Sequence, residues 1–339
     1  MRVTKRPILA AALAVAALLA AIFVAFAIGR FPVSPEDLLA IVWSKISGGE
    51  HGVSATAETV LLQIRGPRVV AALMVGAALA AAGAAYQNLF RNPLVSPDIL
   101  GVSSGAALGA TFGIFFSLDL WWIQGLAFAG GLCAVTAVYL VGQAVRGHDP
   151  ILVLILAGVV IGALLGSVLA LLKYLADPYN QLPAITFWLL GSLSATNLGD
   201  IATTLVPVLL GLVPLWLLRW RMNLMALGDE EAKALGVNVV RVRLTVVAAA
   251  TLMTAAVVSI SGIVGWIGLL IPHFARLLAG PNFARLLPVA LLLGAAFLLL
   301  VDTLARTMAR IEVPLGVLTA FIGTPFFIWL LATARRSWQ

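Results

Sequence analysis

The longest charged segment, residues 225–238, has the spacing of a short capped helix rather than of a catalytic centre. Asp229 can cap a helix, and Glu230 and Glu231 follow it in the first turn, where negative charge favours the positive end of the helix dipole. Gly236 suits the left-handed conformation that ends many helices. The pattern predicts a short amphipathic helix that docks a protein partner, with a plain connector between two apolar segments as the alternative.

Histidine and cysteine give no metal site. His273, beside Pro272, has the chemistry of a metal or haem ligand, but its place near the end of an apolar segment favours a structural role. His51 and His148 lie in polar loops with no second ligand nearby in sequence, and the single cysteine, Cys133, lies inside an apolar run. Because no nucleophile, base and orienting group occur together, we expect neither catalysis nor a cofactor in this chain.

The composition places these residues in a membrane. Of 339 residues, 62% are hydrophobic and 10% are charged, whereas soluble domains carry about 25% charged residues. Long unbroken apolar runs, such as 246–260 and 286–301, favour helices over the alternating strands of a barrel. At about 20 residues a span, the chain fits about ten spans in one membrane domain over 1–339. It has no room for an ATPase and no G-x-x-x-x-G-K-[ST] motif.

The sequence predicts spans at 8–29, 68–87, 94–116, 120–142, 150–173, 199–218, 243–260, 262–279, 286–305 and 314–333. The first follows Arg2, Lys5 and Arg6 and ends near Ala25-Phe26-Ala27, which resembles a signal-peptidase site. Signal cores usually run about 7–15 apolar residues, so this longer segment favours a retained span, with a cleaved signal as the alternative.

The cations set the orientation. With the N-terminus placed in the cytoplasm, 14 of the 21 lysines and arginines fall on inside segments and 7 on outside segments. This bias predicts that both termini are cytoplasmic, and the scattered net charge of +7 is a topology signal rather than a nucleic-acid surface. Four outside cations form two clusters, Arg65 with Arg68 and Arg306 with Arg310.

Small residues and breaks add detail. Glycines recur every four residues at 101–113 and at 158–166, which predicts close helix packing or a helix beside a substrate path. Asn92-Pro93 and Ser96-Pro97 precede the first ladder, and Gly262, Gly265, Gly268 and Pro272 interrupt the eighth span. Broken backbone at membrane depth survives only inside protein or beside a cavity, so the pattern favours a transporter over a simple anchor.

An ordered set of motifs resembles the FecCD family of ABC-importer permeases, which serve uptake of iron-siderophores, haem and vitamin B12. The motifs are IRGPR (64–68), GAAL (76–79), QNLFRNPL (87–94), LGVSSG (100–105), WLLGSL (188–193), LGV (235–237), GLLIPHFAR (268–276), EVPLG (312–316) and GTPFF (323–327).

The resemblance implies a homodimer with ten spans per subunit and a path at the dimer axis. It also implies two cytoplasmic ATPases, which would bind ATP and Mg, and a periplasmic substrate-binding protein. The matching ATPase-coupling residues are Gly228, Asp229, Glu230, Glu231, Ala232, Leu235, Gly236 and Val237. The matching docking residues for the binding protein are Arg65, Arg68 and Arg306, for which anchoring at lipid headgroups is the alternative. The path is expected near Gly158, Gly162, Gly166, Pro314 and Gly316.

The sequence therefore predicts an all-α permease in the inner membrane that carries an iron chelate and performs no chemistry itself. Haem, cobalamin and oxyanions such as molybdate are the alternative cargoes. An ion-driven secondary transporter is the rival class, but it would want ionisable residues inside the spans, and the span centres are nearly free of them. A membrane-embedded enzyme is disfavoured because the spans lack paired histidines or carboxylates.

Overall fold

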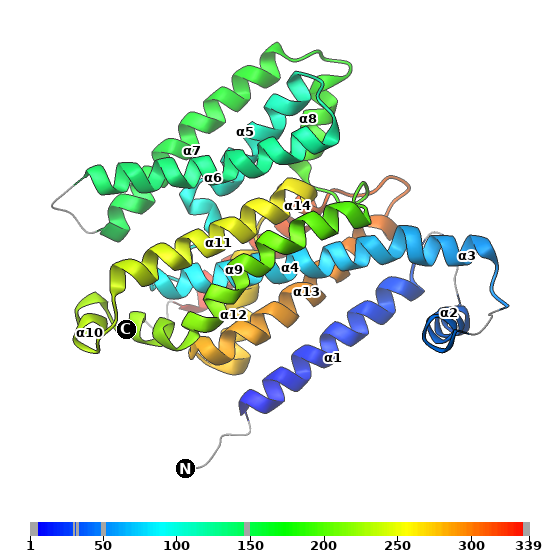
Figure 1. Cartoon of the computed structure of the whole chain (residues 1–339), viewed down its shortest axis with the longest axis horizontal. Coiled ribbons are helices and arrows are strands. Elements are labelled where there is room, and N and C mark those ends of the chain that lie inside the picture. Colours follow the sequence, from blue (N-terminus) through cyan, green and yellow to red (C-terminus); the bar gives the residue numbers. More distant parts are fainter. Residues whose placement is uncertain (1–5, 30, 32–33, 49–51, 146–149, 335–339) are drawn as a thin grey trace.

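The computed structural model describes residues 6–29, 31, 34–48, 52–145 and 150–334, and over these residues the chain is helical, without β-strands (Figure 1). The α-helices are α1 (Arg6–Ala27), α2 (Pro35–Ser47), α3 (Ala55–Thr59), α4 (Gly66–Leu89), α5 (Val102–Phe115), α6 (Leu120–Ala144), α7 (Pro150–Leu175), α8 (Gln181–Leu190), α9 (Leu198–Met225), α10 (Asp229–Ala234), α11 (Val239–Ser261), α12 (Ile267–Ala279), α13 (Phe283–Thr307) and α14 (Leu315–Ala334). A π-helical segment, η1 (Val60–Arg65), joins α3 to α4, and a 3₁₀ turn, η2 (Pro97–Leu100), precedes α5. The all-α class predicted from the composition is confirmed.

Seven described helices have the length and apolar composition to cross a membrane, and they coincide with seven of the predicted spans. They are α1, α4 with α3 and η1, α6, α7, α9, α11 and α13. The remaining predicted spans, 94–116, 262–279 and 314–333, fall on α5, α12 and α14. The first two are shorter apolar helices, and α14 has 20 residues. The shortening has local causes: η2 with left-handed Gly101 replaces the start of one span, and an irregular segment over 262–266 separates α11 from α12. The predicted break is therefore confirmed at Gly262 and Gly265, but it is wrong at Gly268 and Pro272, which lie inside α12.

The long helices run in both directions along the bundle, which has two ends (Figure 1). We call one the α10 end, where α4 and α9 end and α11 and α13 begin. The opposite one, where η1 leads into α4 and where α1, α11 and α13 end, is the α3 end.

The core is built around α4, which packs against α9, α11, α12 and α13 and is buried over most of its length. Close backbone approach requires glycine at two of its crossings. A Cβ on Gly76 would collide with the carbonyl of Gly294 in α13, and a Cβ on Gly83 would collide with the carbonyl of Gly268 in α12. The same packing joins α5 to α6, where Gly105 and Gly109 lie against the α6 backbone. The packing role predicted for the first glycine ladder is thus confirmed.

Three helical segments were not among the predicted spans. α2 begins at a capping box in which the Ser34 hydroxyl accepts from the Asp37 amide at 3.0 Å, so the sequence Ser-Pro-Glu-Asp carried a signal for it. The α3–η1 segment lengthens α4 at the α3 end. α8 is a short apolar helix; Gln181 in its first turn donates to the carbonyl of Phe115 at 2.7 Å.

Candidate functional site

α10 is the short helix that the acidic segment predicts, and it lies at the α10 end between α9 and α11 (Figure 1). It ends as expected: Gly236 is left-handed with φ +82°, and its amide and that of Val237 donate to the carbonyls of Lys233 and Ala232 at 2.9 Å. This double closure is a Schellman motif, and it fixes the end of the helix. One detail of the prediction is wrong. Gly228 is the N-cap, and Asp229 is the first helical residue without a capping bond.

The Asp229 side chain instead binds Arg243 in α11 at 2.6 Å, which ties the start of α10 to the bundle. Gly228 adopts φ +137°, and a Cβ there would collide with the Glu231 carboxylate. Glu230 is 85% exposed, and its hydrogen bond from Lys233, at 2.8 Å, raises the pKa of that ammonium. Buried Ala232 faces the bundle. The helix therefore presents acidic groups outward from a firmly held frame.

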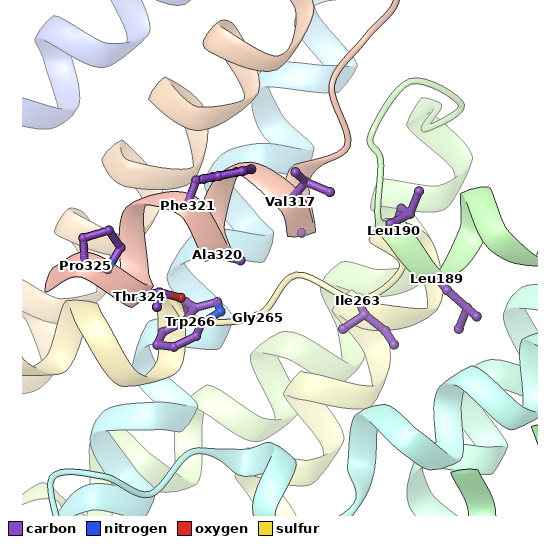
Figure 2. Close-up of a pocket in the computed structure, with 11 residues that line it drawn as sticks. Leu189, Leu190, Ile263, Gly265, Trp266, Val317, Ala320, Phe321, Thr324 and Pro325 are labelled. Atoms are coloured by element: carbon purple, nitrogen blue, oxygen red, sulfur yellow. The ribbon is translucent and has the colours of Figure 1, made fainter. Parts of the chain in front are cut away.

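A second feature is an apolar groove of about 670 Å³ between α8, the irregular 262–266 segment and α14 (Figure 2). The residues that line it are Leu189, Leu190, Ile263, Gly265, Trp266, Gly316, Val317, Ala320, Phe321, Thr324 and Pro325. Two of the lining side chains can hydrogen bond, through the Thr324 hydroxyl and the Trp266 indole N–H. The groove thus suits a bulky apolar surface.

Trp266 forms one wall of this groove. Its backbone is left-handed at φ +70°, which is costly for a bulky residue and is found where surrounding structure enforces it. The indole packs edge-on to Phe327 at a centroid distance of 6.1 Å, and a Cβ on Gly323 would lie 2.7 Å from the indole Cδ2. Glycine at 323 is therefore what admits the indole against α14. Sequence reasoning noted the break at 262–268 but missed Trp266 as the side chain placed by it.

The predicted path residues divide into two groups. Gly316 lines the groove, where a Cβ would meet the carbonyl oxygens of Leu190 and Ile263 at 2.8 and 2.9 Å, and Pro314 lies two residues before it. The α7 glycines are not among the groove residues. Gly158 is buried against the Ile99 carbonyl and serves packing, whereas Gly162 has one atom, Ser104 Oγ, within reach at 3.9 Å. Gly166 faces open space. A path role for the α7 glycines remains a prediction.

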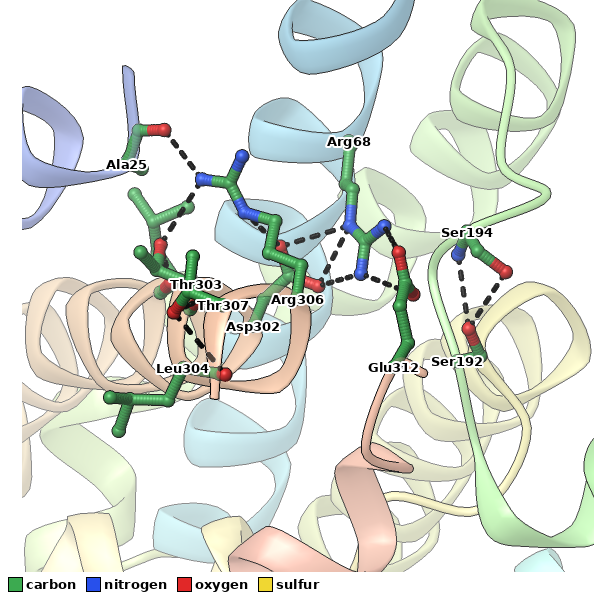
Figure 3. A network of polar contacts seen from close by, with 11 residues as sticks. Ala25, Arg68, Ser192, Ser194, Asp302, Thr303, Leu304, Arg306, Thr307 and Glu312 are labelled. Atoms are coloured by element: carbon green, nitrogen blue, oxygen red, sulfur yellow. Dashed lines mark hydrogen bonds and ion pairs between the residues drawn. The ribbon is translucent and has the colours of Figure 1, made fainter. Parts of the chain in front are cut away.

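A third feature is an ion-pair network at the α3 end (Figure 3). Arg68 donates from Nε and Nη2 to Asp302 in α13 and from Nη1 and Nη2 to Glu312 in the α13–α14 connection, at 2.8–3.1 Å. Arg306 Nε lies 3.7 Å from Asp302 Oδ2, one helical turn away. Asp302 is thus a local partner of Arg306, but its closer partner is Arg68. The sequence singled out Glu312 only as the first residue of the EVPLG motif, so its contact with Arg68 was not predicted.

Two of the predicted docking arginines hold the end of α1. Arg65 donates to the carbonyls of Phe26 and Phe31, and Arg306 donates to the carbonyl of Ala25. The last carbonyls of a helix have no intrahelical partner, and cations there also favour the negative end of the dipole. Both residues are largely buried in the single chain, at 4% and 8% exposed. The docking role itself is untested.

The histidine expectations concern different parts of the chain. His273 in α12 stacks edge-on against Phe326 at 5.8 Å, which fits the structural role expected for it. His51 and His148 lie outside the described residues. Within the described ranges, no group of three His, Cys, Asp or Glu side chains could hold a metal ion.

Comparison with known proteins assigns the chain to a family. Residues 17–333 match the FecCD transport family. The chain is 44% identical over 276 residues to a probable iron chelatin transport permease of Helicobacter pylori, covering 81% of this chain and 83% of the relative. It is 39% identical over 314 residues to the molybdate import permease MolB of Haemophilus influenzae, covering 93% and 92%. It is also 40% identical to the hemin transport permease HmuU of Yersinia pestis, covering 81% and 84%.

A solved structure agrees with the sequence relatives. A metal-chelate type ABC transporter in an inward-facing conformation matches with TM-score 0.85 and 36% identity, covering 95% of this chain and 98% of that one. The fold that contains this helical order, the broken segment over 262–266 and the short helix after α9 is thus similar to that of a solved ABC transporter chain. The chain belongs to the FecCD transport family.

Proposed function

We propose that this chain is the transmembrane permease subunit of an ATP-binding-cassette importer that carries an iron chelate across the inner membrane. The observation that carries the proposal is the joint likeness, at 44% and 36% identity, to an iron chelatin permease and to a metal-chelate ABC transporter. The apolar groove beside a broken helix supports it, because a chelator presents carbon surface to its surroundings and hides the metal charge. On this proposal, 1–339 forms one membrane domain without a catalytic site or cofactor of its own.

Energy would come from a separate polypeptide. We propose that two ATPase subunits, which bind ATP and Mg, dock on α10, so that the α10 end and both termini are cytoplasmic. The outward acidic face of α10 and its rigid Schellman end support this assignment. A rigid element is needed here because a floppy one would absorb the movement of the ATPase instead of passing it to α9 and α11.

The path is proposed to run at the axis of a homodimer, with the groove as part of its wall. Gly316 and Pro314 stand at the start of α14, and Phe321 on the same helix is 74% exposed in the single chain. Two arrangements of the dimer, biased differently by ATP and by cargo, would open the groove alternately to each side. The α3 end is then periplasmic. We propose that a substrate-binding protein docks there through Arg68, and that the more deeply buried Arg65 and Arg306 add positive charge beneath it.

Molybdate is the second candidate cargo. It is favoured by the relative MolB, whose similarity extends over 93% of this chain. The groove argues against it as the first choice, because an oxyanion wants several hydrogen-bond donors and the groove offers few.

The test is transport by the reconstituted importer. The permease, its ATPase and its binding protein are placed in proteoliposomes, and uptake of a radiolabelled ferric siderophore is compared with that of haem, cobalamin and molybdate. ATP-dependent uptake of the iron chelate, absent when the ATPase lysine that contacts phosphate is replaced, supports the proposal. Uptake that follows an ion gradient without ATP contradicts the importer class, and uptake of molybdate alone contradicts the cargo.

A further inference from the structure

Glu312 and Asp302 share one guanidinium but differ in burial (Figure 3). The Asp302 side chain is 1% exposed and that of Glu312 is 32% exposed, while Arg68 between them is 11% exposed. Asp302 accepts from Nε and Nη2, and Glu312 accepts from Nη1 and Nη2. One side of Arg68 is therefore sealed by a buried carboxylate, and the other is covered by a carboxylate that water reaches.

The charges around this pair are unequal. Three guanidiniums, those of Arg65, Arg68 and Arg306, gather at the α3 end with the two carboxylates of Asp302 and Glu312. Among these five side chains the positive charges outnumber the negative ones by one, and by two when Glu312 leaves Arg68. A carboxylate that arrives from outside therefore meets an attractive field, and an Arg fork is suited to receiving it.

We propose that Glu312 holds the place of an acidic side chain of the binding protein, which exchanges with it on Arg68 during docking. The inference rests on the proposed importer function and specifies how its docking end is regulated. Exchange of one carboxylate for another leaves no buried charge unpaired, because Asp302 remains bound to Arg68 throughout. Direct docking on a free arginine would need that arginine exposed, and Arg68 is not.

The exchange on Arg68 can affect the groove through the residues that directly follow Glu312. Glu312 is followed by Val313, whose amide donates to the Ala305 carbonyl, and by Leu315, whose amide donates to the Gly191 carbonyl, both at 3.0 Å. Gly316, the next residue, lies in the groove wall. With Glu312 released, the connection into α14 loses its side-chain tie to Arg68 and keeps these backbone bonds. Docking would thereby favour the arrangement of α14 in which the connection is loose.

The experiment measures affinity of the ligand-free cognate binding protein for the permease–ATPase complex in nanodiscs. Glu312→Gln removes the internal competitor, and Asp177→Asn, in the α7–α8 connection, removes one carboxylate that the proposed topology puts on the same side. We expect Glu312→Gln to bind the protein about twofold to fivefold tighter than wild type, the worth of a partly exposed ion pair. Asp177→Asn should match wild type, and Glu312→Asp should show a smaller gain.

A second arm identifies the incoming group. Binding proteins in which each surface glutamate at the docking face is changed to glutamine are titrated against both permeases. When the binding-protein glutamate that binds Arg68 is changed to glutamine, the permease variant Glu312→Gln should no longer bind the protein more tightly than the wild-type permease does. Unchanged or weaker binding by Glu312→Gln, with wild type binding normally, overturns the exchange and leaves the importer function intact. Failure of wild type to bind the protein at all overturns the proposed importer, and the exchange with it. Should Glu312→Gln not fold, Glu312→Asp alone decides between a gain and no change.

Discussion

Arg243 Nη2 lies 2.6 Å from Asp229 Oδ2, and this ion pair joins α11 to the first residue of α10. The Arg243 side chain is 10% exposed and that of Asp229 is 30% exposed, so the contact is partly buried. One acidic residue of the first turn is thus used to hold the helix, while Glu230, with its Lys233 partner, and Glu231 stay exposed.

We expect Glu230→Arg with Glu231→Arg to abolish assembly with the ATPase while the permease still folds and inserts. The two charges are reversed on a helix whose frame, Asp229–Arg243 and the Gly236 closure, is unchanged. Co-purification of the ATPase and ATP hydrolysis in liposomes measure the effect. Glu36→Arg, in the first turn of exposed α2, is the control and should assemble normally. Normal assembly of the double variant would rule out docking on α10.

Asp302→Asn is expected to destabilise the permease by about 3–5 kcal/mol, because it removes one partner from a buried ion pair and leaves Arg68 partly uncompensated. Glu312→Gln, on the exposed side of the same arginine, should cost only about 0–1 kcal/mol. Thermal inactivation of the purified protein in detergent compares the two. Equal losses would mean that burial does not distinguish the two carboxylates, contrary to their exposures of 1% and 32%.

The α7 glycines provide a matched pair. Gly158→Ala places a methyl group against the Ile99 carbonyl and should destabilise the protein by about 1–3 kcal/mol, as overpacking does. Gly166→Ala adds the same methyl group where nothing lies within 4 Å, and its stability should be unchanged or slightly higher. If Gly166→Ala nevertheless lowers uptake of the chelate, the open end of this ladder lies on the path.

Gly323→Val is expected to reduce transport because its side chain meets the Trp266 indole, and overpacking of this kind costs about 1–3 kcal/mol. Trp266→Ala removes the obstacle, so the double variant should regain part of the loss. The measurement is a double-mutant cycle on uptake in proteoliposomes. Additive losses would show that the two residues do not act through their contact.

The orientation is tested by single cysteines in a Cys133→Ser background, since Cys133 is exposed and would react. We expect Arg310→Cys to be labelled by a membrane-impermeant maleimide on intact spheroplasts and Glu230→Cys only after permeabilisation. Both positions are exposed, so access rather than burial decides the result. Labelling of Glu230→Cys in intact spheroplasts would reverse the proposed topology.

The sequence predicted the helices whose apolar runs are long, because crossing a membrane imposes one length and one composition. It predicted the break near Gly262 and the short helix after α9 for the same kind of reason: glycine, proline and capping residues act locally. α8 was missed because ten apolar residues are too few to cross a membrane, which was the length the spans were sought by.

The polar contacts between distant segments could not be predicted from the sequence in the same way. Arg65 and Arg68 are three residues apart and share one motif, yet one binds backbone carbonyls at the end of α1 and the other binds two carboxylates. Their different partners depend on which helices meet at the α3 end. That meeting is set by glycine contacts such as Gly76 with Gly294, far from the arginines themselves.

The bond from Arg306 to the Ala25 carbonyl spans 281 positions of the chain. A ribosome that has made α1 must therefore complete almost the whole protein before this second cation exists. Until then the Ala25 carbonyl relies on water or lipid headgroups, and Arg65 alone can bind the end of the helix, at Phe26. The buried alanines of α1 likewise wait for α13, on which they pack, so the first helix made is among the last to complete its contacts.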